Sequence, residues 1–483
     1  NLITNDKSMK KIIQRLVNNG KYDFAYERLK EYRNETGFKD FYSMEMGTFF
    51  GMRMAYDKAV QEYLLFLETH PQQLQTISDR IMAYPDIPSI IDSTRYILLK
   101  SPLQSAQFIL ADIYFKQKSY EKGYEILKSN EAPPIMLLNY AKDLASVREF
   151  MHAEKVLTDI ISSKVTEEIV TKAVFEIAKI FESKMIITSQ DLPISGFYPH
   201  NPFFSSPYLP VKEEAGIALE HAMEIYDSLR VSKKNAQAAY RLAEVQFRVL
   251  GDLDGAYYLY EEAHQHGNTK SLRVDAGIGM INIHIAKGDL EAAELTFSKL
   301  KKQNPETIEY DVKSAQIEFY KGNFDATDTK LKEIIEKLPA DHPIYNDILS
   351  VMSILIGFRH NQEEFINFSN IQLHIQQNKR TEAMEKLTFL FDSNEIYIAD
   401  MCRYQKAWLT FLQDEIESAK IQLQSIQHET IFKELSHILQ SEILDYIDQD
   451  ISKAIDSYLE FLELYPSSIY YDDVRLRLRE LTS

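Results

Sequence analysis

Two stretches, Gly288–Pro305 (GDLEAAELTFSKLKKQNP) and Gly322–Pro339 (GNFDATDTKLKEIIEKLP), share the pattern that decides the fold. Each begins with glycine, an acidic or amide residue and a large apolar residue. A small residue, Ala293 or Thr327, follows three positions after the apolar one, and a proline ends each stretch twelve positions later. Because proline cannot continue a helix, the pattern predicts a helix that packs closely at the small residue and ends before the proline.

The small residue recurs along the chain, and we use it as a register mark. The marks are Ala25, Ala59, Gly123, Ala153, Ala256, Ala293, Thr327, Ala383, Ala419 and Ala454. Several successive marks are 34 to 37 residues apart, and the spacing from mark to proline recurs, for instance from Ala59 to Pro71. A degenerate unit, with its mark near Ile90 and its proline at Pro102, follows the second mark. One such unit cannot bury its apolar side alone, so neighbouring units must stack on it.

The period and the pattern resemble the tetratricopeptide repeat, a helix–turn–helix unit of about 34 residues. The resemblance covers residues 9–480 approximately and implies an all-α fold, an α-solenoid wound as a right-handed superhelix of about twelve degenerate units. We expect an N-terminal solenoid over 1–342, an extra or capping helix over 343–360, and a C-terminal solenoid with a terminal capping helix over 361–483. Continuous stacking with one irregular element is the alternative.

One repeat is predicted to contain a long insertion. Thr166–Ser183 predicts its first helix and Lys212–Val231 its second, and about residues 184–211 separate the two. Within the insertion, Ser195–Pro210 (SGFYPHNPFFSSPYLP) holds four prolines and five aromatic side chains. The prolines exclude a regular helix and favour extended or turn conformations.

The aromatic side chains of the insertion allow two interpretations. They form a docking element for a partner, because interface cores are rich in tyrosine and phenylalanine. Alternatively, the segment packs on its own array and buries the rings, because exposed aromatic patches are costly in a monomer. The two can coexist if a packed segment shows one edge to a partner. The candidate partner-binding residues are Phe197, Tyr198, Phe203, Phe204 and Tyr208.

Composition argues against several classes of partner and cofactor. The formal net charge is −18, with 72 acidic and 54 basic residues, which disfavours nucleic acid and anionic membrane surfaces. The single cysteine, Cys402, excludes an intramolecular disulfide and a cysteine-based metal cluster. The sequence has no apolar run long enough to predict a transmembrane helix. We therefore predict no cofactor, no metal and no transmembrane segment.

No local motif predicts catalysis. His264 and His266 are two positions apart, whereas helical metal sites prefer a spacing of three or four. Gly277 and Gly279 fall within a predicted helix and follow no strand, so they do not predict a nucleotide-binding loop. His221 has no nucleophile motif beside it. We therefore expect a protein that is not an enzyme.

The resemblance implies a non-catalytic scaffold or adaptor that holds a protein partner in a multiprotein assembly. The partner would place an extended or helical segment on the concave face, which the first helices of the repeats form. Three alternatives stay open: a homo-oligomeric structural component, a regulatory or substrate-presenting subunit of an envelope-biogenesis enzyme, and a glycan-binding repeat protein.

The end of the chain bears on location. Asp450–Leu481 (DISKAIDSYLEFLELYPSSIYYDDVRLRLREL) is similar to the last repeat and capping helix of bacterial envelope repeat proteins. The similarity implies a periplasmic or envelope-associated protein in a bacterium, associated with membrane complexes through a partner. A cytoplasmic location is the alternative.

Overall fold

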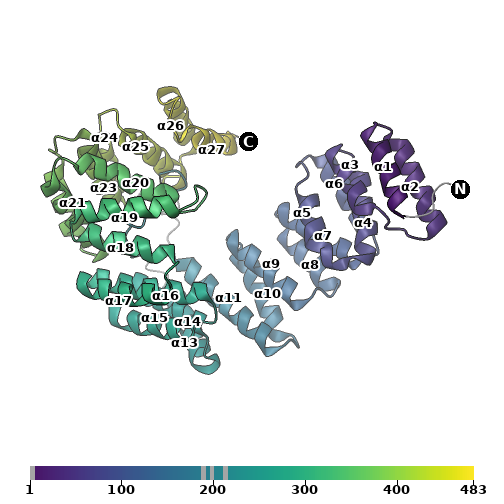
Figure 1. The fold of residues 1–483 in the computed structure, drawn as a ribbon, viewed down its shortest axis with the longest axis horizontal. Helices are drawn as coiled ribbons and strands as arrows, with labels where there is room; N and C mark the ends of the chain where they lie inside the picture. Colours follow the sequence, from purple (N-terminus) through teal and green to yellow (C-terminus); the bar gives the residue numbers. More distant parts are fainter. Residues whose placement is uncertain (1–5, 186–191, 196–200, 210–215, 483) are drawn as a thin grey trace. The chain divides into compact units, whose positions relative to one another are not determined.

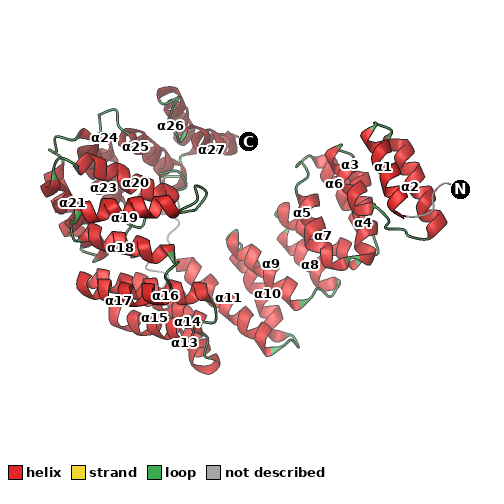
Figure 2. Cartoon of the chain, in the orientation of Figure 1, coloured by secondary structure: helices red, strands yellow, loops and turns green. Residues whose placement is uncertain are grey.

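The computed structural model describes residues 6–185, 192–195, 201–209 and 216–482, and every regular element within them is a helix (Figure 2). By its internal contacts the chain divides into two compact units, Asn1–Ile180 (unit 1) and Phe181–Ser483 (unit 2). The prediction of an all-α helical-repeat fold is confirmed.

Unit 1 is built from helices that are joined by short turns and labelled in Figure 1. Its last helix, α11, continues past the boundary into unit 2, and it is the predicted first helix of the repeat with the insertion. The helices are α1 (Asp6–Asn18), α2 (Tyr22–Thr36), α3 (Ser43–Met52), α4 (Tyr56–Thr69), α5 (Leu74–Met82), α6 (Pro88–Lys100), α7 (Gln104–Lys116), α8 (Tyr120–Ser129), α9 (Pro134–Ser146), α10 (Phe150–Ser162) and α11 (Glu167–Met185).

Unit 2 continues the pattern, with π-helical turns after α14 (Gln246–Leu250) and α25 (Ile443–Ile447). The predicted second helix of the repeat with the insertion is α13, which is described from Gly216 onward. The helices are α13 (Gly216–Lys233), α14 (Ala236–Val245), α15 (Leu253–His266), α16 (Lys270–Lys287), α17 (Leu290–Gln303), α18 (Ile308–Tyr320), α19 (Phe324–Lys337), α20 (Tyr345–Phe358), α21 (Gln362–Gln376), α22 (Arg380–Leu387), α23 (Ile396–Phe411), α24 (Ile416–Gln424), α25 (Ile431–Glu442), α26 (Ile451–Leu464) and α27 (Tyr471–Thr482).

The extra helix predicted within 343–360 is α20. Its buried residues Val351, Ile354 and Phe358 belong to the same hydrophobic core as the buried residues of α18, α21 and α23. The helix α20 therefore contributes to a hydrophobic core that continues on both sides of it in unit 2.

All ten register marks are buried, and each is the fourth residue of its helix. The close packing that requires a small residue is clear at Gly123. A Cβ atom there would lie 2.5 Å from the Tyr140 hydroxyl and 3.1 Å from the carbonyl oxygen of Ala111. The degenerate unit differs, because the fourth residue of α6 is Ile91, which is larger and only partly buried.

A left-handed residue precedes every marked helix, five positions before the mark. These residues are Gly20, Met54, Lys118, Arg148, Gly251, Gly288, Gly322, Asn378, Asp414 and Gln449, with φ between 50° and 80°. Glycine adopts this conformation at least cost, yet only four of the ten positions hold glycine. The turn geometry is thus more regular than the sequence pattern that identifies it.

Side-chain hydrogen bonds join neighbouring repeats at the spacing of the period. Tyr124 of α8 donates to Asp159 of α10 at 2.6 Å, across 35 residues. In the core of unit 2, the side-chain amides of Gln372 and Gln405 donate to each other's oxygen atoms at 2.7 and 2.8 Å, across 33 residues. Because both amides are buried, this reciprocal pair satisfies groups that would otherwise be costly to bury.

A buried ion pair fixes the first two repeats of unit 1. Arg33 of α2 donates two hydrogen bonds to the carboxylate of Glu62 in α4, at 2.9 and 2.6 Å. The arginine is 6% exposed and the glutamate is fully buried. Arg33 also donates to the Phe41 carbonyl oxygen at 3.0 Å and to the Ser43 hydroxyl at 2.9 Å. Tyr26 donates to the same carboxylate at 3.0 Å, so the buried charges are paired and hydrogen-bonded.

Candidate functional site

The described part of the insertion lies along unit 2. We call residues 192–195 and 201–209 the strap, and we call the helix that precedes each marked helix a first helix. The strap bonds to the first helices α18, α21, α23 and α25, to the π-helical turn after α14, and to α20. A segment without regular secondary structure, with a turn at residues 201–205, therefore already contacts these first helices.

Glu442 of α25 holds the beginning of the strap. The backbone N–H groups of Ile194 and Ser195 donate to its two carboxylate oxygens at 2.8 and 2.9 Å. The Glu442 side chain is fully buried, and burial raises the pKa of its carboxyl group, although the bonds from the strap oppose this shift. Tyr404 of α23 donates to the Ser195 carbonyl oxygen at 3.3 Å. Two buried side chains thus provide partners for the backbone at this end of the strap.

Side-chain donors of α18 bind the backbone in the middle of the strap. Gln316 donates to the Pro202 carbonyl oxygen at 2.5 Å. Tyr320, one turn later, donates to the Phe203 carbonyl oxygen at 3.2 Å. These bonds contact main-chain atoms, which is how a groove holds an extended peptide of varied sequence.

The end of the strap is held by α21 and by the π-helical turn after α14. Gln376 of α21 donates to the Ser205 carbonyl oxygen at 2.7 Å. Arg248, in the π-helical turn after α14, donates to the Pro207 carbonyl oxygen at 3.1 Å and accepts from the Leu209 N–H at 2.8 Å through its own carbonyl.

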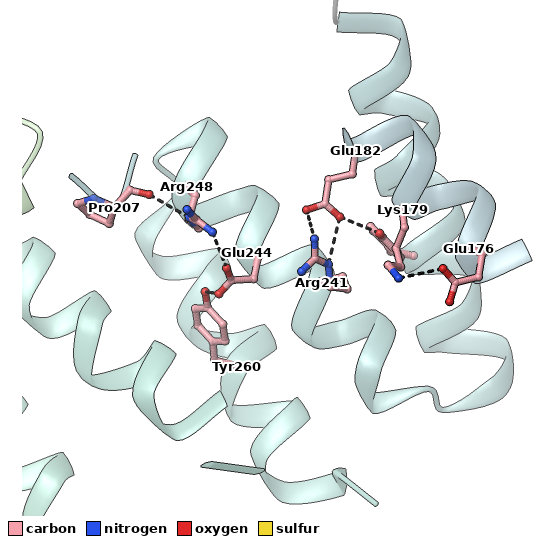
Figure 3. A network of polar contacts seen from close by, with 9 residues as sticks. Glu176, Lys179, Glu182, Pro207, Arg241, Glu244, Arg248 and Tyr260 are labelled. Atoms are coloured by element: carbon pink, nitrogen blue, oxygen red, sulfur yellow. Dashed lines mark hydrogen bonds and ion pairs between the residues drawn. The ribbon is translucent and has the colours of Figure 1, made fainter. Parts of the chain in front are cut away.

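Arg248 belongs to a polar cluster that Figure 3 shows. Its guanidinium lies 3.3 Å from a carboxylate oxygen of Glu244 in α14, and Glu244 also accepts from the hydroxyl of Tyr260 in α15 at 2.5 Å. One turn earlier in α14, Arg241 pairs with Glu182 of α11 (Figure 3). The contact with Pro207 therefore attaches the strap to a side chain that is already fixed on α14.

The structure places three of the predicted partner-binding rings in the core of unit 2. Phe203 is fully buried and Phe204 is 2% exposed, and both pack edge-on against Phe319 of α18, with ring centroids 5.5 and 6.0 Å apart. Tyr208 is 8% exposed and packs edge-on against Phe247 at 5.5 Å. These three rings make the intramolecular contacts that the self-packing interpretation expects.

The other two predicted rings, Phe197 and Tyr198, lie outside the described residues. No contact tests whether any of the five rings binds a partner, so their partner-binding role stays a prediction. Among the described rings, Phe203 and Phe204 belong to one core with residues of α18 and α21, and Tyr208 packs beside the π-helical turn after α14.

Sequence reasoning missed the polar side chains that hold the strap. Gln316 lies eleven positions before its mark, and Tyr320 and Gln376 each lie seven positions before theirs. Position relative to the mark is therefore the signal that could have found them. In unit 1, Asp112 of α7 occupies the position of Gln316, eleven residues before Gly123.

Asp112 gives a prediction about pH. Burial raises the pKa of this carboxyl group from 3.8 to about 6; the hydrogen bond from Ser78 opposes the shift and the nearby Asp143 adds to it. The folded state then holds a proton that the unfolded state releases, so the free energy of unfolding falls as the pH rises from about 4 to about 6. In Asp112→Asn this loss is absent, and we expect the variant to be more stable than wild type at pH 7 by about 2 kcal/mol.

Urea unfolding of both proteins between pH 4 and pH 7 measures this difference. The two proteins should have closely similar stabilities at pH 4, which serves as the internal control. An Asp112→Asn variant that is less stable than wild type at pH 7 would show that the ionised carboxylate is stabilised by its surroundings.

Within the described ranges, no helix is sufficiently long and apolar to span a membrane. The same residues contain no group of three or more His, Cys, Asp or Glu side chains placed to hold a metal ion. His264, considered above as a metal ligand, lies with its Nδ1 2.7 Å from the Arg273 carbonyl oxygen. Cys402 is buried in the core, and burial raises the pKa of its thiol.

Comparisons with known proteins agree with the repeat pattern. Residues 250–317 match the family model described as tetratricopeptide repeat. A solved tetratricopeptide repeat protein from Parabacteroides merdae is 16% identical, with 64% of this chain and 98% of that chain covered and a TM-score of 0.34. Yeast Tom70, another solved structure, is 13% identical in sequence. The match covers 93% of this chain and 96% of that chain, with a TM-score of 0.24. None of the curated proteins matches the chain. Residues 250–317 thus match the tetratricopeptide repeat, and the period and the buried register marks show a helical-repeat protein in the described part of the chain.

Proposed function

We propose that the chain is a non-catalytic scaffold whose first helices bind extended segments of partner proteins. The strap is the observation that carries this proposal. In unit 2 the first helices already hold a non-helical segment of the chain, by donors to its carbonyl oxygens and by apolar sites for its rings. Both kinds of contact are those by which grooves recognise extended peptides.

Unit 1 supports the same role. The connections between its described helices are at most six residues long, too short to cover its first helices as the strap covers those of unit 2. We therefore propose that a partner segment binds the first helices of unit 1, and that the strap occupies the corresponding surface of unit 2.

A peptide-binding experiment tests the proposal. Ser195–Pro210 is replaced by a Gly/Ser linker of equal length, and a fluorescent peptide of residues 192–209 is titrated into this variant and into the intact chain. We expect the variant to bind the peptide and the intact chain to bind it at least tenfold more weakly, because its own strap competes. A peptide with Ala at Phe203 and Phe204 is the matched control. Circular dichroism checks that the variant is folded. If the folded variant does not bind the peptide, the proposal is contradicted.

The role in a multiprotein assembly and the envelope location are part of the proposal. The similarity of Asp450–Leu481 to envelope repeat proteins supports the location, and cell fractionation tests it. Light scattering distinguishes the scaffold from a homo-oligomeric component, which would be larger than one chain at micromolar concentration. Co-purification of a catalytic chain would instead favour a regulatory or substrate-presenting subunit.

A further inference from the structure

The degenerate repeat of unit 1 contains a cavity of about 290 Å³. The end of α5, the following connection, α6 and the end of α7 line it. Its wall is mainly apolar and includes four isoleucines, Ile81, Ile90, Ile91 and Ile113.

The cavity has a cause in the repeat pattern. The regular repeats have a small residue at the fourth position of the second helix, whereas α6 has Ile91 there. Its connection from α5 contains Pro85 and lacks the left-handed residue that precedes each of the ten marked helices. As a result α6 packs against α4 and α7, and α5 packs against α7. The helices α5 and α6 thus do not pack against each other as the two helices of a regular repeat do.

A buried polar group lines this apolar cavity. Thr94 of α6 is 3% exposed, and its hydroxyl has no hydrogen-bond partner among the described residues. Buried hydroxyls without a partner are rare because they are costly. The hydroxyl therefore lacks a hydrogen-bond partner within the described protein, and a ligand in the cavity that reaches Thr94 would supply one.

The charged residues of the cavity are already paired. Lys116 of α7 lies 2.6 Å from a carboxylate oxygen of Asp86 and donates to the Met82 carbonyl oxygen at 2.9 Å. A charged ligand would have to break this pair or be buried against the isoleucines, which is costly. The cavity therefore suits an uncharged ligand.

We propose that the cavity binds an uncharged, mainly apolar molecule whose hydroxyl or carbonyl group bonds to Thr94. An apolar cavity of about 150 Å³ holds benzene, so one of twice that volume suits a molecule of about ten to twelve heavy atoms. This is a small-molecule site, and it is independent of the peptide-binding role proposed above.

Methyl NMR of the full chain, labelled at the isoleucine δ1 carbons, tests the site with 2-naphthol and naphthalene as probes. We expect 2-naphthol to shift the signals of the four cavity isoleucines and to bind about fivefold to tenfold more tightly than naphthalene, because it gains one hydrogen bond. In Thr94→Val, which keeps the side-chain shape, the two probes should bind equally. The isoleucine signals of unit 2 are the control and should not move.

Two results would overturn the proposal. One is the absence of shifts at the cavity isoleucines of the wild-type chain at millimolar probe, which would make the cavity a packing defect. The other is an equal preference for 2-naphthol in wild type and Thr94→Val, which would remove the threonine from recognition. The wild-type titration needs no variant to fold, so it tests the site by itself.

Discussion

Replacing Arg33 by methionine lowers the free energy of unfolding of the repeats around it by about 3 to 5 kcal/mol, because the substitution leaves the Glu62 carboxylate buried without its cation. The pair joins α2 and α4 through two short hydrogen bonds, and both side chains lie within the core of unit 1. Methionine has a similar length and keeps most of the packing. The loss therefore reports on the charge and not on a cavity.

Urea unfolding at neutral pH measures this loss, and two further variants sharpen it. In Arg33→Met with Glu62→Leu no unpaired charge remains, and we expect most of the lost stability to return. Arg28→Met is the matched control on the same helix. Arg28 forms an ion pair with the exposed Glu31 at 2.7 Å, and its removal should cost less than about 1 kcal/mol. Equal losses for Arg33→Met and Arg28→Met would refute a special role for the buried pair.

The repeat architecture could be predicted because its signals are local. A small residue such as Ala293 and the proline twelve positions later lie within one helix and its end, so a single stretch of sequence contains both. The left-handed turns before the marked helices were harder to predict from the sequence. Glycine at these positions would have indicated a left-handed residue, but Met54 and Lys118 adopt the same conformation. Each marked helix needs a residue with positive φ before it. The packing of the neighbouring helices stabilises this conformation enough for residue types other than glycine to adopt it.

The path of the strap could not be predicted, because its contacts are far apart in the sequence. Gln316 bonds to Pro202 across 114 residues, and Glu442 bonds to Ser195 across 247. In the sequence, Gln316 is one of many polar residues in helices. Only the stacked first helices place it beside the insertion. The aromatic content of the insertion could be seen, but the surface that receives it is formed by several repeats together.

Replacing Phe203 by alanine lowers the free energy of unfolding of unit 2 by about 3 to 5 kcal/mol, because a fully buried ring is removed. Phe389→Ala is the matched control. That ring belongs to the same unit but is 78% exposed, so its removal should change stability by less than about 0.5 kcal/mol. Chemical denaturation of the full chain measures both.

The comparison of these two variants distinguishes the two interpretations of the insertion. A large loss for Phe203→Ala alone means that the rings of the strap are part of the core, so that a partner binding the same first helices must first displace them. Equal, small losses would mean that the strap leaves its surface readily in solution. Phe203 and Phe204 would then be available to a partner, and the first helices of unit 2 would be open to an extended segment from another protein.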